Sequence, residues 1–205
     1  MVIIGLAGGS GSGKSVVTKI FRELGFCGID TDRVYRKLTE KSSECLDALS
    51  REFGDDIITE RGALDRRRLA ERVFLSDDAG QKRIRLNEIT HKYILDEVRR
   101  IISAQPKEAL GAVVDAPLLF ESGFDKECDF LVAVIADKDK RISRILVRDG
   151  VSRLEAERRI ASQLSDERLC ELCDYVIVNN GDGDELRACV LSVAEKILRT
   201  EGLVK

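Results

Sequence analysis

The feature that most constrains the fold is a glycine-rich segment near the N-terminus, Gly8-Gly9-Ser10-Gly11-Ser12-Gly13-Lys14-Ser15. It matches the pattern of a glycine, any four residues, then glycine, lysine and serine or threonine. The residues before it, 1–7, form a short apolar run typical of a strand that is buried on both faces. The residues after it, 14–24, carry apolar side chains at helical spacing up to Gly25. The sequence therefore predicts a strand, a glycine loop and a helix in direct succession.

Such a loop predicts a binding site for phosphate groups. Backbone N–H groups and the positive end of the helix dipole converge where the loop meets its helix. We expect the loop to bind a nucleoside triphosphate, with Lys14 reaching the β- and γ-phosphates and the Ser15 hydroxyl binding Mg²⁺. The alternative is a glycine-rich turn with a solvated lysine, and the strand and helix on either side make it the weaker interpretation.

Four more apolar runs of strand length complete a predicted sheet, at residues 26–29, 112–114, 130–136 and 175–178. Helical periodicity separates most of them and is clearest between Leu186 and Leu198. The alternation predicts an α/β fold with a doubly wound, five-stranded parallel sheet. About 80 residues separate the second and third predicted strands, far more than an ordinary connection. Their apolar residues repeat at helical spacing, so we expect a helical insertion there.

The composition argues against a partner that is a nucleic acid or a membrane. The chain has 34 Lys and Arg against 37 Asp and Glu, a formal net charge of −3, so no global positive field attracts phosphate backbones or anionic lipid. It contains no apolar stretch of about 18 residues and no export signal. We expect a cytoplasmic protein that binds small molecules and is a monomer or a small homo-oligomer.

The six cysteines are scattered along the chain, which predicts reduced thiols rather than a disulfide framework. Cys170 and Cys173 form the only Cys-x-x-Cys pair, and no second pair of ligands stands nearby in the sequence to complete a zinc site. We therefore expect these two to be buried structural thiols.

Two aspartates follow predicted strands at the edge where open α/β sheets bind their ligands. Asp32 comes just after the second strand and is our candidate for the base that takes a proton from an acceptor hydroxyl, with a helix N-cap as the alternative. Asp115 ends the third strand and is our candidate for holding Mg²⁺, directly or through water, with a solvated or capping aspartate as the alternative. The residues 117–120 after it are typical of a packed turn.

Basic side chains are concentrated in residues 138–168, which contain nine basic and six acidic residues. Arg141, Arg144 and Arg148 are spaced to lie along one face of a helix. A lid whose arginines close over transition-state charge has this composition, and so does a solvated helix face with Arg–Glu pairs. His91, the only histidine of the chain, is more typical of a structural than of a catalytic residue.

In combination these motifs resemble the dephospho-CoA kinase family over nearly the whole chain. The matching segments are GLAGGSGSGKS at 5–15, IDTD at 29–32, FGDDII at 53–58, ITHKYI at 89–94, DAPLLFESG at 115–123, RISRILVRDG at 141–150, RRIASQLS at 158–165 and CDYVIVNNGD at 173–182. The loop alone fits many kinases. Its combination, in this order, with the segments that follow residues 115 and 173 is specific.

The resemblance implies ATP-dependent phosphorylation of the ribose 3′-hydroxyl of dephospho-CoA. It also implies a nucleotide-binding core (1–30, 106–137 and 169–205), a helical acceptor-binding insertion (31–105) and a lid (138–168). It suggests Asp32 as the base and Arg144 as a contact of the transferred phosphate. The nucleotide contacts it implies are Gly8, Gly9, Ser10, Gly11, Ser12, Gly13, Lys14, Ser15, Arg148 and Asn179, and the acceptor contacts are Asp32, His91, Pro117, Leu118 and Arg144.

The chain departs from the family pattern at three positions. Ala7 stands where the family commonly has threonine, so any hydroxyl contact from that position is lost, and Ser10 replaces the usual isoleucine in the loop. Lys92 replaces the proline that usually follows His91, which alters the expected shape of the acceptor pocket.

Two other functions share some of these features. Another small-molecule P-loop kinase, for a nucleoside or nucleotide, would have the same loop, base and lid, and only the helical insertion would choose a different acceptor. A GTPase-like switch is less consistent, because Asn179-Asn180-Gly181-Asp182 lacks the lysine of the guanine-reading motif and no Asp-x-x-Gly follows the third strand.

Overall fold

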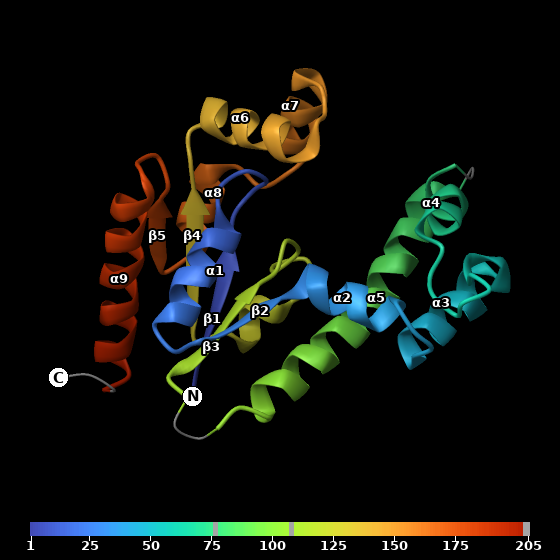
Figure 1. Cartoon of the computed structure of the whole chain (residues 1–205), viewed down its shortest axis with the longest axis horizontal. Helices are drawn as coiled ribbons and strands as arrows, with labels where there is room; N and C mark the ends of the chain where they lie inside the picture. Colours follow the sequence, from blue (N-terminus) through green and yellow to red (C-terminus); the bar gives the residue numbers. More distant parts are fainter. Residues whose placement is uncertain (76–77, 107–108, 203–205) are drawn as a thin grey trace. The chain divides into compact units, whose positions relative to one another are not determined.

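The computed structural model describes residues 1–75, 78–106 and 109–202. Its sheet has the strands β1 (Val2–Ala7), β2 (Cys27–Asp30), β3 (Gly111–Asp115), β4 (Phe130–Ile135) and β5 (Tyr175–Val178). All pairs are parallel, in the order β2-β3-β1-β4-β5 (Figure 1). The predicted α/β fold with a five-stranded parallel sheet is confirmed, because each apolar run forms a strand.

The central strand is β1, which pairs with β3 on one side and with β4 on the other. Leu6 is in register with Asp115 and with Val132, and Asp115 is also in register with Asp30. In a parallel sheet these carboxyl ends share one edge. The register therefore brings Asp30 and Asp115 to the edge of the sheet at which the glycine loop leaves β1.

Two compact units make up the chain, one of Met1–Asp30 with Gln105–Lys205 and one of Thr31–Ala104. The first unit holds the sheet. Its helices are α1 (Lys14–Glu23), η2 (Phe124–Glu127), α6 (Lys138–Asp149), α7 (Arg153–Ala161), α8 (Asp166–Leu172) and α9 (Gly183–Thr200).

The core of this first unit lies where α1 and α9 cover the sheet, and their apolar faces are buried with those of β1, β4 and β5 (Figure 1). Phe21 and Phe26 contact each other edge to face, with ring centroids 5.3 Å apart. This contact lies at the C-terminal end of α1, the helix that continues directly from the glycine loop.

The second unit is helical, with a core of its own, and β pairing in it is limited among its described residues to an isolated bridge between Ile58 and Leu64. Ser43 begins α3 by accepting a hydrogen bond from the N–H of Leu46, and Asp65 begins α4 in the same way. The elements are α2 (Thr31–Thr39), α3 (Glu44–Phe53), η1 (Asp55–Ile57), α4 (Arg66–Phe74) and α5 (Ala79–Ser103). The helical periodicity of the sequence here is realised as helices.

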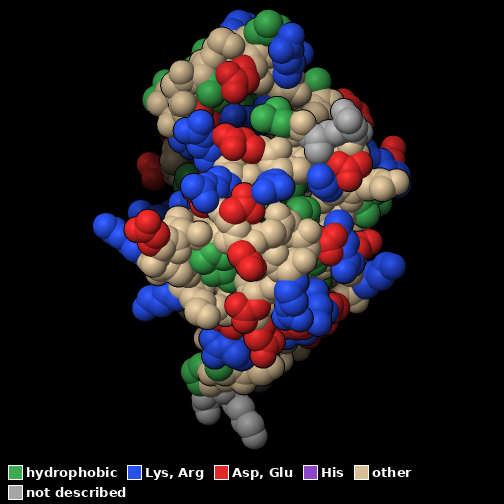
Figure 2. All heavy atoms as spheres, turned by 90° about the vertical axis from the view of Figure 1, so that its right-hand side faces the viewer, with side chains coloured by type: hydrophobic (Ala, Val, Ile, Leu, Met, Phe, Trp, Pro, Cys, Tyr) green, Lys and Arg blue, Asp and Glu red, His purple; other side chains and the backbone are tan. Residues whose placement is uncertain are grey.

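Basic and acidic side chains are interspersed over the face shown in Figure 2. No helix among the described residues has the length and apolar character needed to cross a membrane. The six cysteines are all free thiols. The expectation that Cys170 is buried is wrong, because Cys170 is exposed near the end of the short helix α8, whereas Cys173 is half-buried.

Candidate active site

The glycine loop between β1 and α1 has the backbone that its sequence predicts. Gly8, Gly11 and Gly13 have φ values of 154°, 77° and 100°, in the region that side chains disfavour. Gly13 is also the N-cap of α1, and no side chain caps the helix there. The start of α1 is therefore left open to an external acceptor.

Several backbone N–H groups of the loop are not used in hydrogen bonds to described residues. The N–H of Ser12 donates to the carbonyl of Gly9 at 3.1 Å, which closes a turn. Among the residues that the structure describes, none accepts a hydrogen bond from the N–H groups of Gly11, Gly13 or Ser15. Three N–H groups within five residues, at the positive end of a helix, can bind the oxygens of a phosphate group.

Lys14 lies at the same end of the sheet. Its Nζ donates to the carbonyl of Gly8 at 2.7 Å and lies 3.9 Å from Oδ1 of Asp115. Both side chains are 13% exposed, so their attraction is less screened than at the surface. The lysine is thus held over the loop by a carbonyl and a carboxylate, where its ammonium group can also meet a phosphate.

Ser15 and Asp115 are the predicted Mg²⁺ ligands, and their chemistry fits this ion. Magnesium prefers oxygen ligands and is usually bound through one or two protein groups together with phosphate oxygens and water. Ser15 offers an exposed hydroxyl in the first turn of α1, and Asp115 offers a carboxylate at the end of β3. A group of three or more acidic, histidine or cysteine side chains that could hold a metal ion is not found among the described residues.

Arg144 and Asn179 hold the outer side of the loop. Nη1 of Arg144 donates to the carbonyl of Gly11 at 3.1 Å, and its Nη2 donates to the carbonyl of Asn179 at 3.0 Å. The buried Asn179 donates from Nδ2 to the carbonyl of Ser12 at 2.7 Å. A Cβ on Gly13 would overlap this amide nitrogen, so glycine is required there on both conformational and steric grounds.

Arg148 differs from the other two arginines of α6. Its side chain is 60% exposed and forms a two-point ion pair with its neighbour Asp149, at 2.7 and 2.9 Å. The hydrogen bond from Arg148, reinforced by one from Arg159, lowers the pKa of Asp149 to about 2. The predicted contact between Arg148 and the nucleotide stays a prediction.

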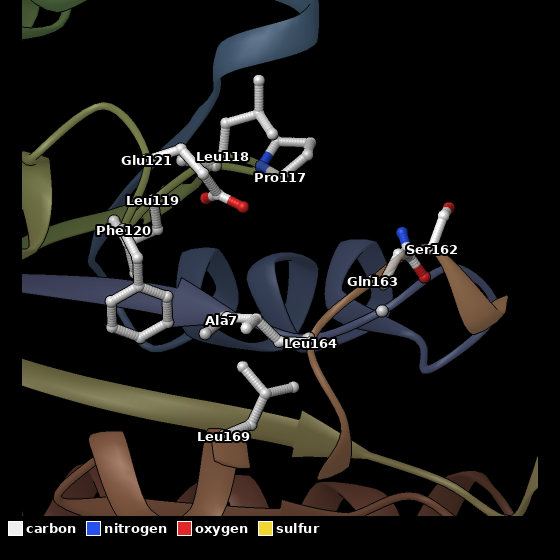
Figure 3. Close-up of a pocket in the computed structure, with 13 residues that line it drawn as sticks. Ala7, Pro117, Leu118, Leu119, Phe120, Glu121, Ser162, Gln163, Leu164 and Leu169 are labelled. Carbon is white, nitrogen blue, oxygen red and sulfur yellow. The ribbon is translucent and has the colours of Figure 1, made fainter. Parts of the chain in front are cut away.

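A pocket opens beside the start of the glycine loop. Figure 3 shows residues 117–121, which follow β3, on one side and Ser162 and Gln163 on the other, with Ala7 and Leu164 between them and Leu169 below. Its lining is mostly apolar and also includes Gly8, Gly9 and Ala116. Glu121 carries the single charge among these lining residues. An apolar pocket with few polar groups is typical of a site for a small organic molecule.

Comparison with known proteins decides the family. The family model for dephospho-CoA kinase matches residues 2–185. A dephospho-CoA kinase of Corynebacterium glutamicum is 38% identical over 199 residues, which is 97% of this chain and 98% of that protein. The chain belongs to the dephospho-CoA kinase family. It is therefore an enzyme, a kinase of the family that converts dephospho-CoA to coenzyme A in the last step of coenzyme A biosynthesis, and kinase membership implies ATP as a substrate.

Solved structures show the same fold as this member of the dephospho-CoA kinase family. A crystal structure of a Thermus thermophilus protein has a TM-score of 0.78 and 30% identity, covering 95% of this chain and 97% of that one. A dephospho-CoA kinase from Campylobacter jejuni has a TM-score of 0.69 and 24% identity, covering 97% and 98%. The sheet order and the loop are thus embedded in a fold that is used by known kinases.

Two residues predicted for the dephospho-CoA kinase reaction belong to the other unit. Asp32 lies in the first turn of α2, two residues beyond Asp30 at the end of β2, and His91 is half-buried on α5. The covalent chain keeps Asp32 within about 7 Å, Cα to Cα, of Asp30. The roles of Asp32 as base and of His91 as an acceptor contact stay predictions.

Sequence reasoning missed two residues that the structure brings to this site. Gln163 donates to and accepts from Ser10 in the loop, and Glu121 lines the pocket. Both lie within segments that carry the family resemblance. A charged residue directly after an apolar turn could have pointed to Glu121, whereas an uncharged amide 153 residues from its partner gives no local signal.

Proposed function

We propose that this kinase transfers the γ-phosphoryl group of ATP to the ribose 3′-hydroxyl of dephospho-CoA, giving coenzyme A and ADP. Family membership supports the acceptor, because the match extends over nearly the whole chain. The glycine loop supports ATP as the donor. The N–H groups of Gly11, Gly13 and Ser15 donate to no described residue, and the Lys14 ammonium lies in the same segment. This donor set complements a chain of phosphates.

The side chains divide the reaction between them. Lys14 neutralises charge on the β- and γ-phosphates, and Asp32 accepts the proton of the attacking hydroxyl. Arg144, which lies against the loop carbonyls, contacts the transferred phosphoryl group and stabilises the charge that develops on it. Ser15 and Asp115 would hold Mg²⁺, which when bound neutralises phosphate charge.

The pocket of Figure 3 is proposed to receive part of the acceptor. It borders Gly8 and Gly9, so a molecule bound in it lies beside the loop that binds the donor. Pro117 and Leu118 provide the apolar wall that the family resemblance implies. Asp32 and His91, the other acceptor contacts that the family resemblance implies, belong to the helical unit.

We further propose that the enzyme works in the cytoplasm on its two small-molecule substrates, as a monomer or small homo-oligomer, without a nucleic-acid or membrane partner. The six free thiols are consistent with a reducing compartment. The balanced charge of the sequence, with a net value of −3, is consistent with the absence of polyanion binding.

A substrate panel tests the proposed reaction. Purified protein with Mg-ATP is incubated with dephospho-CoA, adenosine, AMP or cytidine, and ADP formation is followed for each. We expect rapid phosphorylation of dephospho-CoA alone, because the insertion and the pocket are what separate this kinase from nucleoside and nucleotide kinases. Faster turnover of AMP or cytidine would assign the chain to the rival class of kinase. Calorimetric titration with ATP and with GTP excludes a guanine-nucleotide switch if ATP binds more tightly.

Replacing Arg144 by alanine should lower kcat by at least about tenfold while raising the Kd of ATP by less than about threefold, because a group that acts mainly in the transition state affects turnover more than binding. Steady-state kinetics and calorimetry measure the two quantities. The matched control is Arg153→Ala on α7, an arginine that is exposed and pairs with Asp139 and Glu157. An Arg144 variant that loses only ATP affinity would contradict a role in the transition state.

A further inference from the structure

Arg141 is the arginine of α6 that the structure buries, with 4% of its surface exposed. Its Nε donates to the carbonyl of Ser10 at 3.0 Å, and its Nη1 forms an ion pair with Asp166 at 3.0 Å. Its Nη2 donates to Oε1 of Gln163 at 3.3 Å. Burying a guanidinium costs free energy unless it is paired, and here all three nitrogens have partners.

Gln163 holds the other side of the same loop residue. Its Oε1 accepts from the N–H of Ser10 at 2.8 Å, and its Nε2 donates to Oγ of Ser10 at 3.2 Å. Every hydrogen bond of Ser10 with a described residue therefore goes to Arg141 or Gln163. The peptide groups on both sides of Ser10 are thereby fixed from outside the loop.

The hydrogen bond to the Ser10 carbonyl determines the direction of the next N–H group in the loop, that of Gly11. The carbonyl of Ser10 and the N–H of Gly11 belong to one planar peptide group, and in a trans peptide they point in opposite directions. Holding the carbonyl on Arg141 therefore aims the Gly11 N–H away from Arg141. Asn179 has the same effect two residues later in the loop. It donates to the Ser12 carbonyl and so sets the direction of the Gly13 N–H.

Arg141 also lies close to the two glycines of the loop that the motif does not require. The motif fixes glycine at positions 8 and 13 and leaves positions 9 and 11 open. A Cβ on Gly9 would overlap Nη2 of Arg141 and lie 2.8 Å from Oε1 of Gln163, and a Cβ on Gly11 would lie 2.6 Å from the carbonyl oxygen of Arg141. Gly9 does not have a positive φ, so its only evident reason for being glycine is the approach of these side chains.

We propose that Arg141, assisted by Gln163, is a positioning residue of this kinase: it holds the Ser10 carbonyl and thereby aims the Gly11 N–H at the phosphates of the nucleotide. The proposal rests on the proposed binding of ATP by the loop. It does not depend on which alcohol accepts the phosphoryl group.

Nucleotide binding in the absence of acceptor tests the proposal. Arg141→Lys keeps the charge but cannot hold Ser10 and Asp166 together, so we expect the Kd values of ATP and ADP each to rise about tenfold in calorimetric titrations. Dephospho-CoA binding should be unchanged. The control is Arg153→Lys, which should leave all three Kd values at the wild-type level. If Arg141 had only a structural role, its substitution would lower the Tm and the active fraction but would not change the Kd values of the folded protein. Kd values of ATP and ADP within twofold of wild type would therefore overturn the proposal.

A double-mutant cycle tests the contact itself. Gly9→Ala alone should raise the Kd of ATP by about tenfold or more, because the added Cβ displaces Arg141. In an Arg141→Ala background the same change should add less than about twofold. Equal penalties in both backgrounds would show that Gly9 is constrained by something else.

Gln163→Ala keeps the inference testable if the Arg141 variants do not fold. Gln163 is exposed, so its removal should spare the fold, and we expect the Kd of ATP to rise about threefold, as for the loss of a hydrogen bond. An unchanged Kd in this variant would also count against the proposal. Because these titrations contain no acceptor, a chain that phosphorylates an alcohol other than dephospho-CoA would still give a clear result.

Discussion

Replacing Asp32 by asparagine is expected to lower kcat by at least about 10²-fold, because a positioned general base typically contributes a factor of that size. The amide is nearly isosteric with the carboxylate, so the loss is confined to the proton acceptor. The start of α2 and the affinity for ATP should be preserved, since the donors for the phosphates are loop groups such as the Gly13 N–H. Steady-state kinetics with dephospho-CoA, together with calorimetry for ATP, measure both quantities.

The control for this variant is Asp47→Asn, which removes an exposed carboxylate from the first turn of α3 in the same unit. It should have wild-type kcat. A bell-shaped or sigmoidal pH profile of kcat that loses its acidic limb in Asp32→Asn would support the role as base. Turnover of Asp32→Asn within a few-fold of wild type would remove Asp32 from the mechanism.

Replacing Lys14 by alanine is expected to lower kcat by about 10²–10³-fold, the range found when one preorganised charge-stabilising donor is removed. The hydrogen bond to the Gly8 carbonyl and the attraction to Asp115 disappear with the ammonium group. The buried Asp115 then faces the phosphates without the Lys14 ammonium, which adds repulsion to the lost attraction. Single-turnover experiments with Mg-ATP and dephospho-CoA separate the slower chemistry from weaker binding.

The matched control is Lys19→Ala, because Lys19 is exposed on the same helix, α1. Its loss should change kcat by less than about twofold, since exposed charges are screened by water and salt. Equal effects of the two substitutions would show that Lys14 acts only through the overall charge of α1.

The parts of the fold that could be predicted are those with a local signal. The continuous apolar run identified β1, because strands buried on both faces of a parallel sheet are apolar at successive positions. The glycines and the helical spacing after them identified the loop and α1, because a glycine-rich loop before a helix is typical of an anion site. The order of the strands has no such signal. That β1 lies between β3 and β4 follows from packing among segments more than 100 residues apart.

The arginines of α6 show where sequence reasoning about the site ends. The spacing of Arg141, Arg144 and Arg148 indicates only that they share one helix face. It does not distinguish their roles. The structure gives them different partners: Ser10 for Arg141, the Gly11 carbonyl for Arg144 and the neighbouring Asp149 for Arg148. Each partner is set by the path of the chain in three dimensions, so the local pattern could not distinguish them.

The pairing of β1 has a consequence for how the protein emerges from the ribosome. β1 is the first strand to be synthesised, yet its neighbours begin at Gly111 and Phe130. At a synthesis rate of roughly 5–20 residues per second, β3 is completed on the order of 5–20 s after the glycine loop. Gln163 is synthesised later still. The segment that we propose to bind the nucleotide is therefore translated well before the side chains that hold it. A truncated chain that ends before α6 can have the complete loop motif without Arg141, Arg144 and Gln163.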